Sequence, residues 1–256
     1  MVFIDTHTHL YSEQFNSDRQ AMIQRALDAG VDRLFLPNID SGSIPSLFAL
    51  CKQFPGHCFP MMGLHPCSVN NKYNDELKVV EHWLEKMRFY AIGEIGIDLY
   101  WDKTFVNQQK DAFAHQIDLA KRYDLPIVIH TRNSFSETYE IVAGMNDRRL
   151  KGIFHCFTGT VDDAKRIIAL GGFKMGIGGV LTFKNSGLDK VLEEVDLKYL
   201  VLETDSPYLA PVPYRGKRNE SAYIPLIAEK LAMIKGTTVE EVARITTQNA
   251  LEIFEL

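Results

Sequence analysis

Features that would assign this chain of 256 residues to several specialised classes are missing. Its four cysteines form no CxxC pair, which argues against a structural zinc site or a dithiol redox motif. Those cysteines are Cys51, Cys58, Cys67 and Cys156, and we expect reduced thiols. No apolar run approaches the roughly 18 residues that a membrane-spanning helix needs. The sequence therefore predicts neither a disulfide-rich secreted domain nor a membrane protein.

An excess of positive charge is also missing, since the net charge is -5 and the isoelectric point is about 5.9. A protein that coats nucleic acid would be basic. An enzyme whose bound cations supply positive charge inside one cleft is not excluded. The segment Met1–Asp5 shows no basic region followed by an apolar one, as a secretory signal would. We therefore expect a cytoplasmic protein.

Eight short apolar runs are present, each followed by an amphipathic stretch. Continuous apolar runs of this length are typical of strands buried on both faces of a parallel sheet. The runs are Val2–Asp5, Arg33–Pro37, Cys58–Gly63, Tyr90–Ile95, Pro126–His130, Gly152–His155, Phe173–Ile177 and Tyr199–Glu203. Helical patterns follow them, including Asn107–Tyr123 and a segment from Ile224 to Ile234 with Gly236 behind it.

Eight strand–helix units without a linker predict an α/β protein with one closed (β/α)₈ TIM barrel, a single domain over residues 1–256. The alternative is a doubly wound open sheet. That fold predicts a glycine-rich phosphate loop after the first strand, and Asp5-Thr6-His7-Thr8-His9 has no glycine at all.

Polar residues follow or end these apolar runs, where a barrel builds its catalytic rim. They are His7, His9, His65, Glu94, His130, His155 and Asp205. His7 and His9 are two apart, so both imidazoles point to one face and can bind one ion. Glu94 lies in an apolar run, where a carboxylate is costly unless it is paired, for instance with Arg132, or bound to metal.

Each of the other polar residues has an alternative interpretation. A lone histidine such as His130 or His155 is more often a hydrogen-bonded core residue, but their equivalent positions beside Glu94 favour metal ligands. Asp205 could instead cap the turn before Pro207.

Three further features have two interpretations each. His65 could bind at the rim or pack under a loop. The basic stretch Arg215–Asn219 could contact phosphates or be an ordinary surface loop. Trp83 and Trp101 could each be core residues or base-stacking residues.

Seven ordered segments resemble the TatD family of metal-dependent deoxyribonucleases, within the amidohydrolase-like barrel superfamily. They are Ile4–His9, Gly63–Pro66, Ile92–Asp98, Ile129–Arg132, His155–Gly159, Leu202–Leu209 and Arg218–Glu220. The positions Leu99, Ser221 and Asn133-Ser134 depart from the family pattern, and none of them is a proposed ligand.

The resemblance implies two divalent cations per chain and a nucleic-acid substrate. The implied metal ligands are His7, His9, Glu94, His130, His155 and Asp205. Glu94 would bridge the ions, Asp205 would accept a proton from the attacking water, and His65 and Arg218 would be lesser members of the active site. The implied reaction is removal of nucleotides from single-stranded DNA in the 3′→5′ direction, with RNA as a further substrate.

The predicted ligands are all nitrogen or oxygen donors, which suits Mg²⁺, Mn²⁺, Zn²⁺ or Ni²⁺. Two other function classes remain open. One is a barrel amidohydrolase or esterase that acts on a small molecule, and the other is a binding protein without catalysis. We expect a monomer with no membrane partner.

Overall fold

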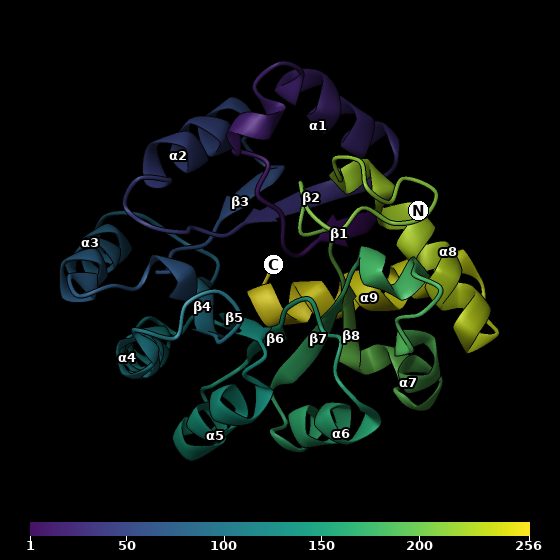
Figure 1. Cartoon of the computed structure of the whole chain (residues 1–256). Helices are drawn as coiled ribbons and strands as arrows, with labels where there is room; N and C mark the ends of the chain where they lie inside the picture. The colour runs from purple at the N-terminus through teal and green to yellow at the C-terminus, as the bar shows by residue number, and fades with distance from the viewer.

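Strands and helices alternate along the whole chain in the computed structural model, which describes residues 1–256 (Figure 1). The strands are β1 Phe3–Asp5, β2 Val31–Leu36, β3 Cys58–Pro60, β4 Ile92–Asp98, β5 Ile127–Arg132, β6 Gly152–Phe154, β7 Phe173–Ile177 and β8 Leu200–Leu202. The helices are α1 Arg19–Asp28, α2 Ile44–Gln53, α3 Tyr73–Lys86, α4 Val106–Tyr123, α5 Phe135–Met145, α6 Val161–Ala169, α7 Leu188–Glu194, α8 Ile224–Lys235 and α9 Val239–Phe254. Five short 3₁₀ helices lie between them: η1 Glu13–Phe15, η2 Pro66–Ser68, η3 Gly179–Thr182, η4 Leu197–Tyr199 and η5 Ser221–Tyr223.

All strand pairs are parallel, in the orders β1-β2-β3 and β4-β5-β6-β7-β8. Two seams join these groups into one ring. A bridge between Met62 and Ile92 links the end of β3 to β4. At the other seam, the Thr6 amide donates to the Leu202 carbonyl at 3.0 Å. Helices surround the ring (Figure 1), so the predicted TIM-barrel fold is confirmed over an open doubly wound sheet.

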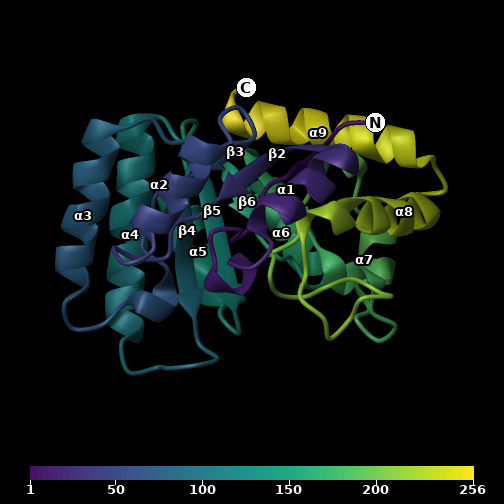
Figure 2. The ribbon, with the colours of Figure 1, turned by 90° about the horizontal axis from the view of Figure 1, so that it is seen from above.

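An apolar cluster fills the interior of the barrel and closes one end of it. The strands contribute inward-facing residues such as Ile4, Val128 and Val201, as the alternation of strand side chains requires. Helix α9 completes this cluster with Phe254, whose ring stacks on Phe35 at a centroid distance of 3.7 Å. Figure 2 shows α9 lying across one end of the molecule, with the long loops at the other. The open end is therefore the carboxyl end of the strands.

At their carboxyl ends, two strands extend further than the apolar pattern predicts. The β4–β5 ladder continues through the pairs Gly96–His130 and Asp98–Arg132. Glu94 and His130 consequently lie inside their strands, and the prediction that they end them is wrong. The polar Asp98 and Arg132 hide this extension in the sequence, although backbone pairing does not require apolar side chains.

The helices follow the predicted pattern closely. Asn107–Tyr123 falls within α4, and α8 ends at Lys235, where Gly236 caps the helix in the left-handed conformation with φ 59°. None of the helices combines the length and the apolar character required to cross a bilayer.

Candidate metal centre

The carboxylate of Glu94 lies at the centre of a cluster of imidazoles at the open end of the barrel. Its side chain is only 3% exposed. Its Oε2 atom lies 3.1 Å from Nε2 of His7 and 3.5 Å from Nε2 of His9. Those two imidazole nitrogens are themselves 3.3 Å apart. The HxH segment that follows β1 therefore aims both rings at one oxygen of Glu94, as predicted from the two-residue spacing.

The other oxygen of Glu94 faces a different set of histidines. Oε1 lies 2.8 Å from Nδ1 of His130, 3.2 Å from Nε2 of His155 and 3.4 Å from Nε2 of His65. Each oxygen of one carboxylate thus has its own group of nitrogen donors. His65 follows β3 and precedes η2, and the structure brings it into the cluster rather than under a loop.

Asp205 completes the side of the cluster formed by His7 and His9. Its Oδ1 atom lies 3.7 Å from Nε2 of His7 and 3.6 Å from Nε2 of His9. The loop after β8 is held in place because the Asp205 amide donates to the His7 carbonyl at 2.9 Å. Asp205 is 16% exposed, and this opening faces the rim.

The sequence interpretation missed three residues, each of which contacts the ring nitrogen of a histidine that points away from Glu94. Tyr11 contacts Nδ1 of His9 through its hydroxyl at 3.0 Å, and donates to the Pro37 carbonyl at 2.6 Å. Asp98 lies 2.9 Å from Nε2 of His130, and Glu203 lies 3.1 Å from Nδ1 of His155. Such partners orient metal-binding histidines and fix their tautomer. Spacing offered a weak signal, because Asp98 is four residues after Glu94 and Glu203 two before Asp205.

Asp5 is a fourth unforeseen residue, a carboxylate buried beneath the cluster at the end of β1. Its Oδ2 atom accepts hydrogen bonds from the hydroxyls of Thr204 and Ser221, both at 2.6 Å. Burial raises the pKa of Asp5 to about 7. Asp5 thereby ties β1 to the loop after β8 and to the start of η5.

The charges within the cluster fit a bound cation. Burial lowers the pKa of His7 well below its usual value, and nearby His155 adds to this effect. Burial alone would raise the pKa of Glu94, but the surrounding histidines together hold that pKa well below its usual range. Nε2 of His7 and Oε2 of Glu94 lie 3.1 Å apart, and Nδ1 of His7 is buried without a hydrogen-bond partner. A divalent cation placed between the two side chains would take one ligand atom from each.

Three overlapping groups of side chains bring their ligand atoms within 4.8 Å of one another. They are His7 with His9 and Glu94, His7 with His155 and Asp205, and His65 with Glu94 and His130. All six predicted ligands therefore meet at one place, and every donor is nitrogen or oxygen. Such a set suits divalent cations of the kind expected from the sequence.

Arg218, the other predicted substrate-binding residue, has partners outside this cluster. Its guanidinium binds both carboxylate oxygens of Asp18 at 2.7 Å and the Gln14 carbonyl at 2.8 Å. It also lies over the ring of Phe15, at 4.5 Å from the centroid. These contacts join the loop after β8 to the segment before α1. A phosphate role for Arg218 stays a prediction that would require it to leave Asp18.

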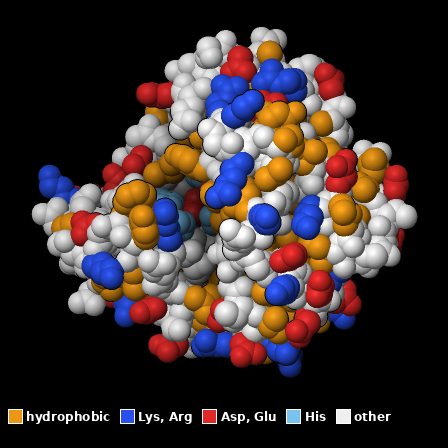
Figure 3. All heavy atoms as spheres, turned by 45° about the vertical axis from the view of Figure 1, so that its right-hand side comes forward, with side chains coloured by type: hydrophobic (Ala, Val, Ile, Leu, Met, Phe, Trp, Pro, Cys, Tyr) orange, Lys and Arg blue, Asp and Glu red, His pale blue; other side chains and the backbone are white.

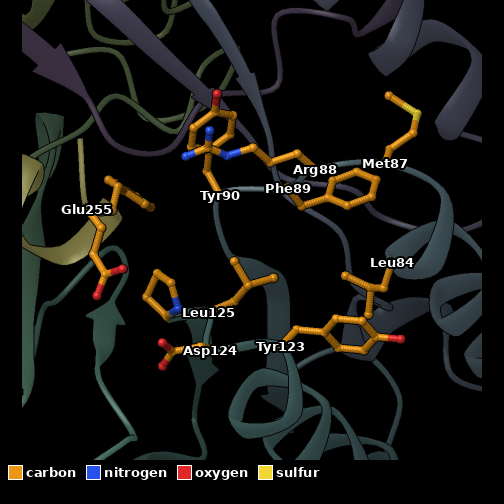
Figure 4. Close-up of a pocket in the computed structure, with 11 residues that line it drawn as sticks. Leu84, Met87, Arg88, Phe89, Tyr90, Tyr123, Asp124, Leu125 and Glu255 are labelled. Carbon is orange, nitrogen blue, oxygen red and sulfur yellow. The ribbon is translucent and has the colours of Figure 1, made fainter.

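A hollow at the open end exposes the cluster. Figure 3 shows histidine and acidic side chains on its floor, with hydrophobic and basic side chains around it. A separate cavity of about 350 Å³ lies at the other end of the barrel, between the ends of α3, α4 and α9 (Figure 4). It is lined by residues such as Leu84, Tyr123 and Phe254, and contains no histidine. The chemistry therefore belongs to the hollow at the carboxyl end.

Known proteins resemble this chain over its full length. The family model of TatD related DNase matches residues 4–255. An uncharacterized metal-dependent hydrolase of Bacillus subtilis strain 168, YabD, is 35% identical over 256 residues, which is 100% of both chains. The 3′-5′ ssDNA/RNA exonuclease TatD of Pantoea vagans strain C9-1 is 31% identical over 258 residues, covering 98% of this chain and 99% of its own.

A solved structure agrees with these relatives. The crystal structure of YjjV, a TatD homolog from Escherichia coli K12, matches with a TM-score of 0.93 at 29% identity, and covers 99% of this chain and 98% of that one. The match of fold, length and sequence shows that this chain belongs to the TatD related DNase family of metal-dependent hydrolases.

Proposed function

We propose that this protein is a two-metal phosphodiesterase that removes nucleotides from single-stranded DNA in the 3′→5′ direction, and also acts on RNA. The whole of residues 1–256 would form its one catalytic domain. The observation that carries the proposal is the position of Glu94, whose two oxygens face separate groups of imidazoles. The relative named as a 3′-5′ ssDNA/RNA exonuclease supports the choice of substrate and direction.

The residues divide into two ligand sets that share Glu94. One ion would be held by His7, His9, Glu94 and Asp205, and the other by Glu94, His130 and His155. His65 lies 3.4 Å from the Glu94 oxygen of the second set, so it would support that side. When bound, divalent cations supply positive charge to the phosphate and make the attacking water more acidic.

The chain itself would supply a base and would orient the metal-binding side chains. Asp205 is the more exposed of the two central carboxylates, at 16% against 3% for Glu94, so it is open to water entering from the rim. We assign it the role of accepting the proton of the attacking water. Asp98, Glu203 and Tyr11 would keep the histidines in one tautomer and orientation.

The loop after β8 that contains Arg218 would bind the phosphates of the substrate, through the two other basic residues of that loop. Arg215 and Lys217 are exposed and have no carboxylate within ion-pairing distance, unlike Arg218. Both lie over aromatic rings, Arg215 at 4.4 Å from the centroid of Phe183 and Lys217 at 5.9 Å from that of Tyr214. Free cations of this kind can bind the nucleic-acid backbone without reading its sequence.

Digestion of a single-stranded oligonucleotide tests the proposal. The strand is labelled at its 5′ end and incubated separately with Mg²⁺, Mn²⁺, Zn²⁺ and Ni²⁺. A ladder shortening by one nucleotide at a time from the 3′ end is the expected result. Turnover of amides or lactones with no cleavage of the oligonucleotide would instead favour a small-molecule hydrolase.

A further inference from the structure

Two large aromatic side chains lie exposed on the loop that follows β4, at the open end of the barrel. Tyr100 is 51% exposed and Trp101 is 68% exposed. Their rings meet edge to face, with centroids 4.8 Å apart and an interplanar angle of 87°. Covering exposed aromatic surface of this size with another flat group lowers the free energy of the system. The other tryptophan, Trp83, is half-buried and packs against Phe48. Of the two tryptophans, only Trp101 therefore has a ring that a ligand can reach.

A positively charged side chain, that of Arg132, lies against these rings. The guanidinium carbon of Arg132, at the end of β5, lies 4.0 Å from the centroid of Tyr100 and 5.1 Å from that of Trp101. Arg132 forms no ion pair with a carboxylate in the structure, so its charge remains available to an anion. An arginine stacked on aromatic rings can bind a base face and a phosphate together.

One carboxylate ties this surface to the candidate metal centre. Oδ1 of Asp98 accepts hydrogen bonds from the backbone amides of Tyr100 at 2.9 Å and of Trp101 at 3.2 Å. Oδ2 of the same carboxylate lies 2.9 Å from Nε2 of His130. The backbone of Tyr100 and Trp101 is therefore anchored beside a proposed metal ligand.

We propose that Tyr100, Trp101 and Arg132 form a stacking platform for an unpaired base of the substrate strand. The inference rests on the proposed nuclease function and extends it by naming the part of the substrate that is bound. A cavity beside Trp101 has a volume of only about 50 Å³, so a base cannot enter it and must stack on the outer face of the ring. Only a single strand offers a free base face, so the platform selects against duplex.

Substitution of Trp101 tests the platform, using an oligonucleotide and a copy with abasic sites near its 3′ end. Trp101→Ala should raise KM for the intact strand about 10-fold, since one base stack has that order of strength, and should change kcat less than twofold. Trp101→Phe should restore most of the loss. The abasic strand should show no difference between wild type and Trp101→Ala. The exposed residue Met233 on α8 provides the control Met233→Ala.

Two outcomes would overturn the platform while the nuclease function stands. One is an unchanged KM for the intact strand in Trp101→Ala. The other is an equal loss on the intact and the abasic strand, which would indicate a structural role for Trp101.

Tryptophan fluorescence in the presence of a chelator provides a readout that needs no turnover. The intact strand should quench the emission of wild type, and both the abasic strand and the Trp101→Phe variant should show little quenching. This separates the two proposals if wild type cleaves no oligonucleotide with any metal. Quenching by the intact strand alone would then support the platform although the nuclease function fails, and absence of quenching would overturn it.

Discussion

Asp205 is the residue whose chemistry can be tested with the smallest structural change. Asp205→Asn keeps a ligand oxygen but removes the ability to accept a proton. We expect kcat to fall at least about 100-fold, the usual contribution of a general base, while at least one metal ion stays bound. Steady-state kinetics and metal analysis of the same preparation check this, with exposed Asp162→Asn as the control. Nearly full activity would show that Asp205 is not the base.

Glu203 tests whether the residues behind the histidines matter. Its Oε1 atom contacts Nδ1 of His155 and also accepts the Cys156 amide at 2.6 Å. Glu203→Gln keeps the shape but removes the charge that orients the ring. We expect metal affinity to weaken by about 10- to 100-fold, measured by competition with a chromophoric chelator.

The matched control for Glu203 is the exposed Glu194→Gln on α7, which should not change affinity. Equal affinities in wild type and Glu203→Gln would remove Glu203 from the metal centre.

For single residues, the sequence predicted those that interrupt an apolar pattern. It missed those whose role depends on contact with a residue far away in the sequence. His7, Glu94 and His155 are polar groups within or directly after buried strands, and their equivalent positions together predicted a function. Asp98 and Glu203 act only because the fold places them against particular ring nitrogens. Arg218 illustrates the same limit, since its ion pair with Asp18 joins residues 200 positions apart.

Helix α9 allows the stability of the barrel to be tested separately from metal binding. Phe254 closes the end of the barrel opposite to the metal centre and is almost fully buried. Phe254→Ala should lower the free energy of unfolding by about 3–5 kcal/mol, the cost of truncating a buried phenylalanine. Urea titration measures this, and metal affinity below the transition should equal that of wild type.

The control for this helix is Met233→Ala, which should change stability by less than about 0.5 kcal/mol. If Phe254→Ala weakened metal binding in the folded state, the two ends of the barrel would be coupled.

The order of the elements could be predicted because each strand has its own apolar run and each helix its own amphipathic period. The ends of β4 and β5 could not, since their last residues pair through backbone atoms whatever their side chains. The sequence also did not predict that α9 closes one end of the barrel. Its burial depends on packing against strands from the whole ring, which local periodicity does not record.

For the whole molecule, the barrel core and the metal centre occupy opposite ends, so removing metal should leave the fold intact. Chelation should abolish hydrolysis, and added divalent cation should restore it. The loss of stability should be only the linkage contribution of a few kcal/mol. Circular dichroism before and after chelation checks this, and collapse of the spectrum would show that the cations are structural.

The number of ions bound per chain tests the two-metal proposal most directly. It is measured on wild type, Glu94→Ala and His130→Ala at equal free metal. Wild type should bind two ions, and His130→Ala should keep the ion held by His7 and His9. Glu94→Ala should lose one ion and bind the other more weakly, because it removes a ligand from both sites and an anion that offsets the repulsion between two dications. Loss of the same single ion in both variants, with the remaining affinity unchanged, would contradict a bridging role for Glu94.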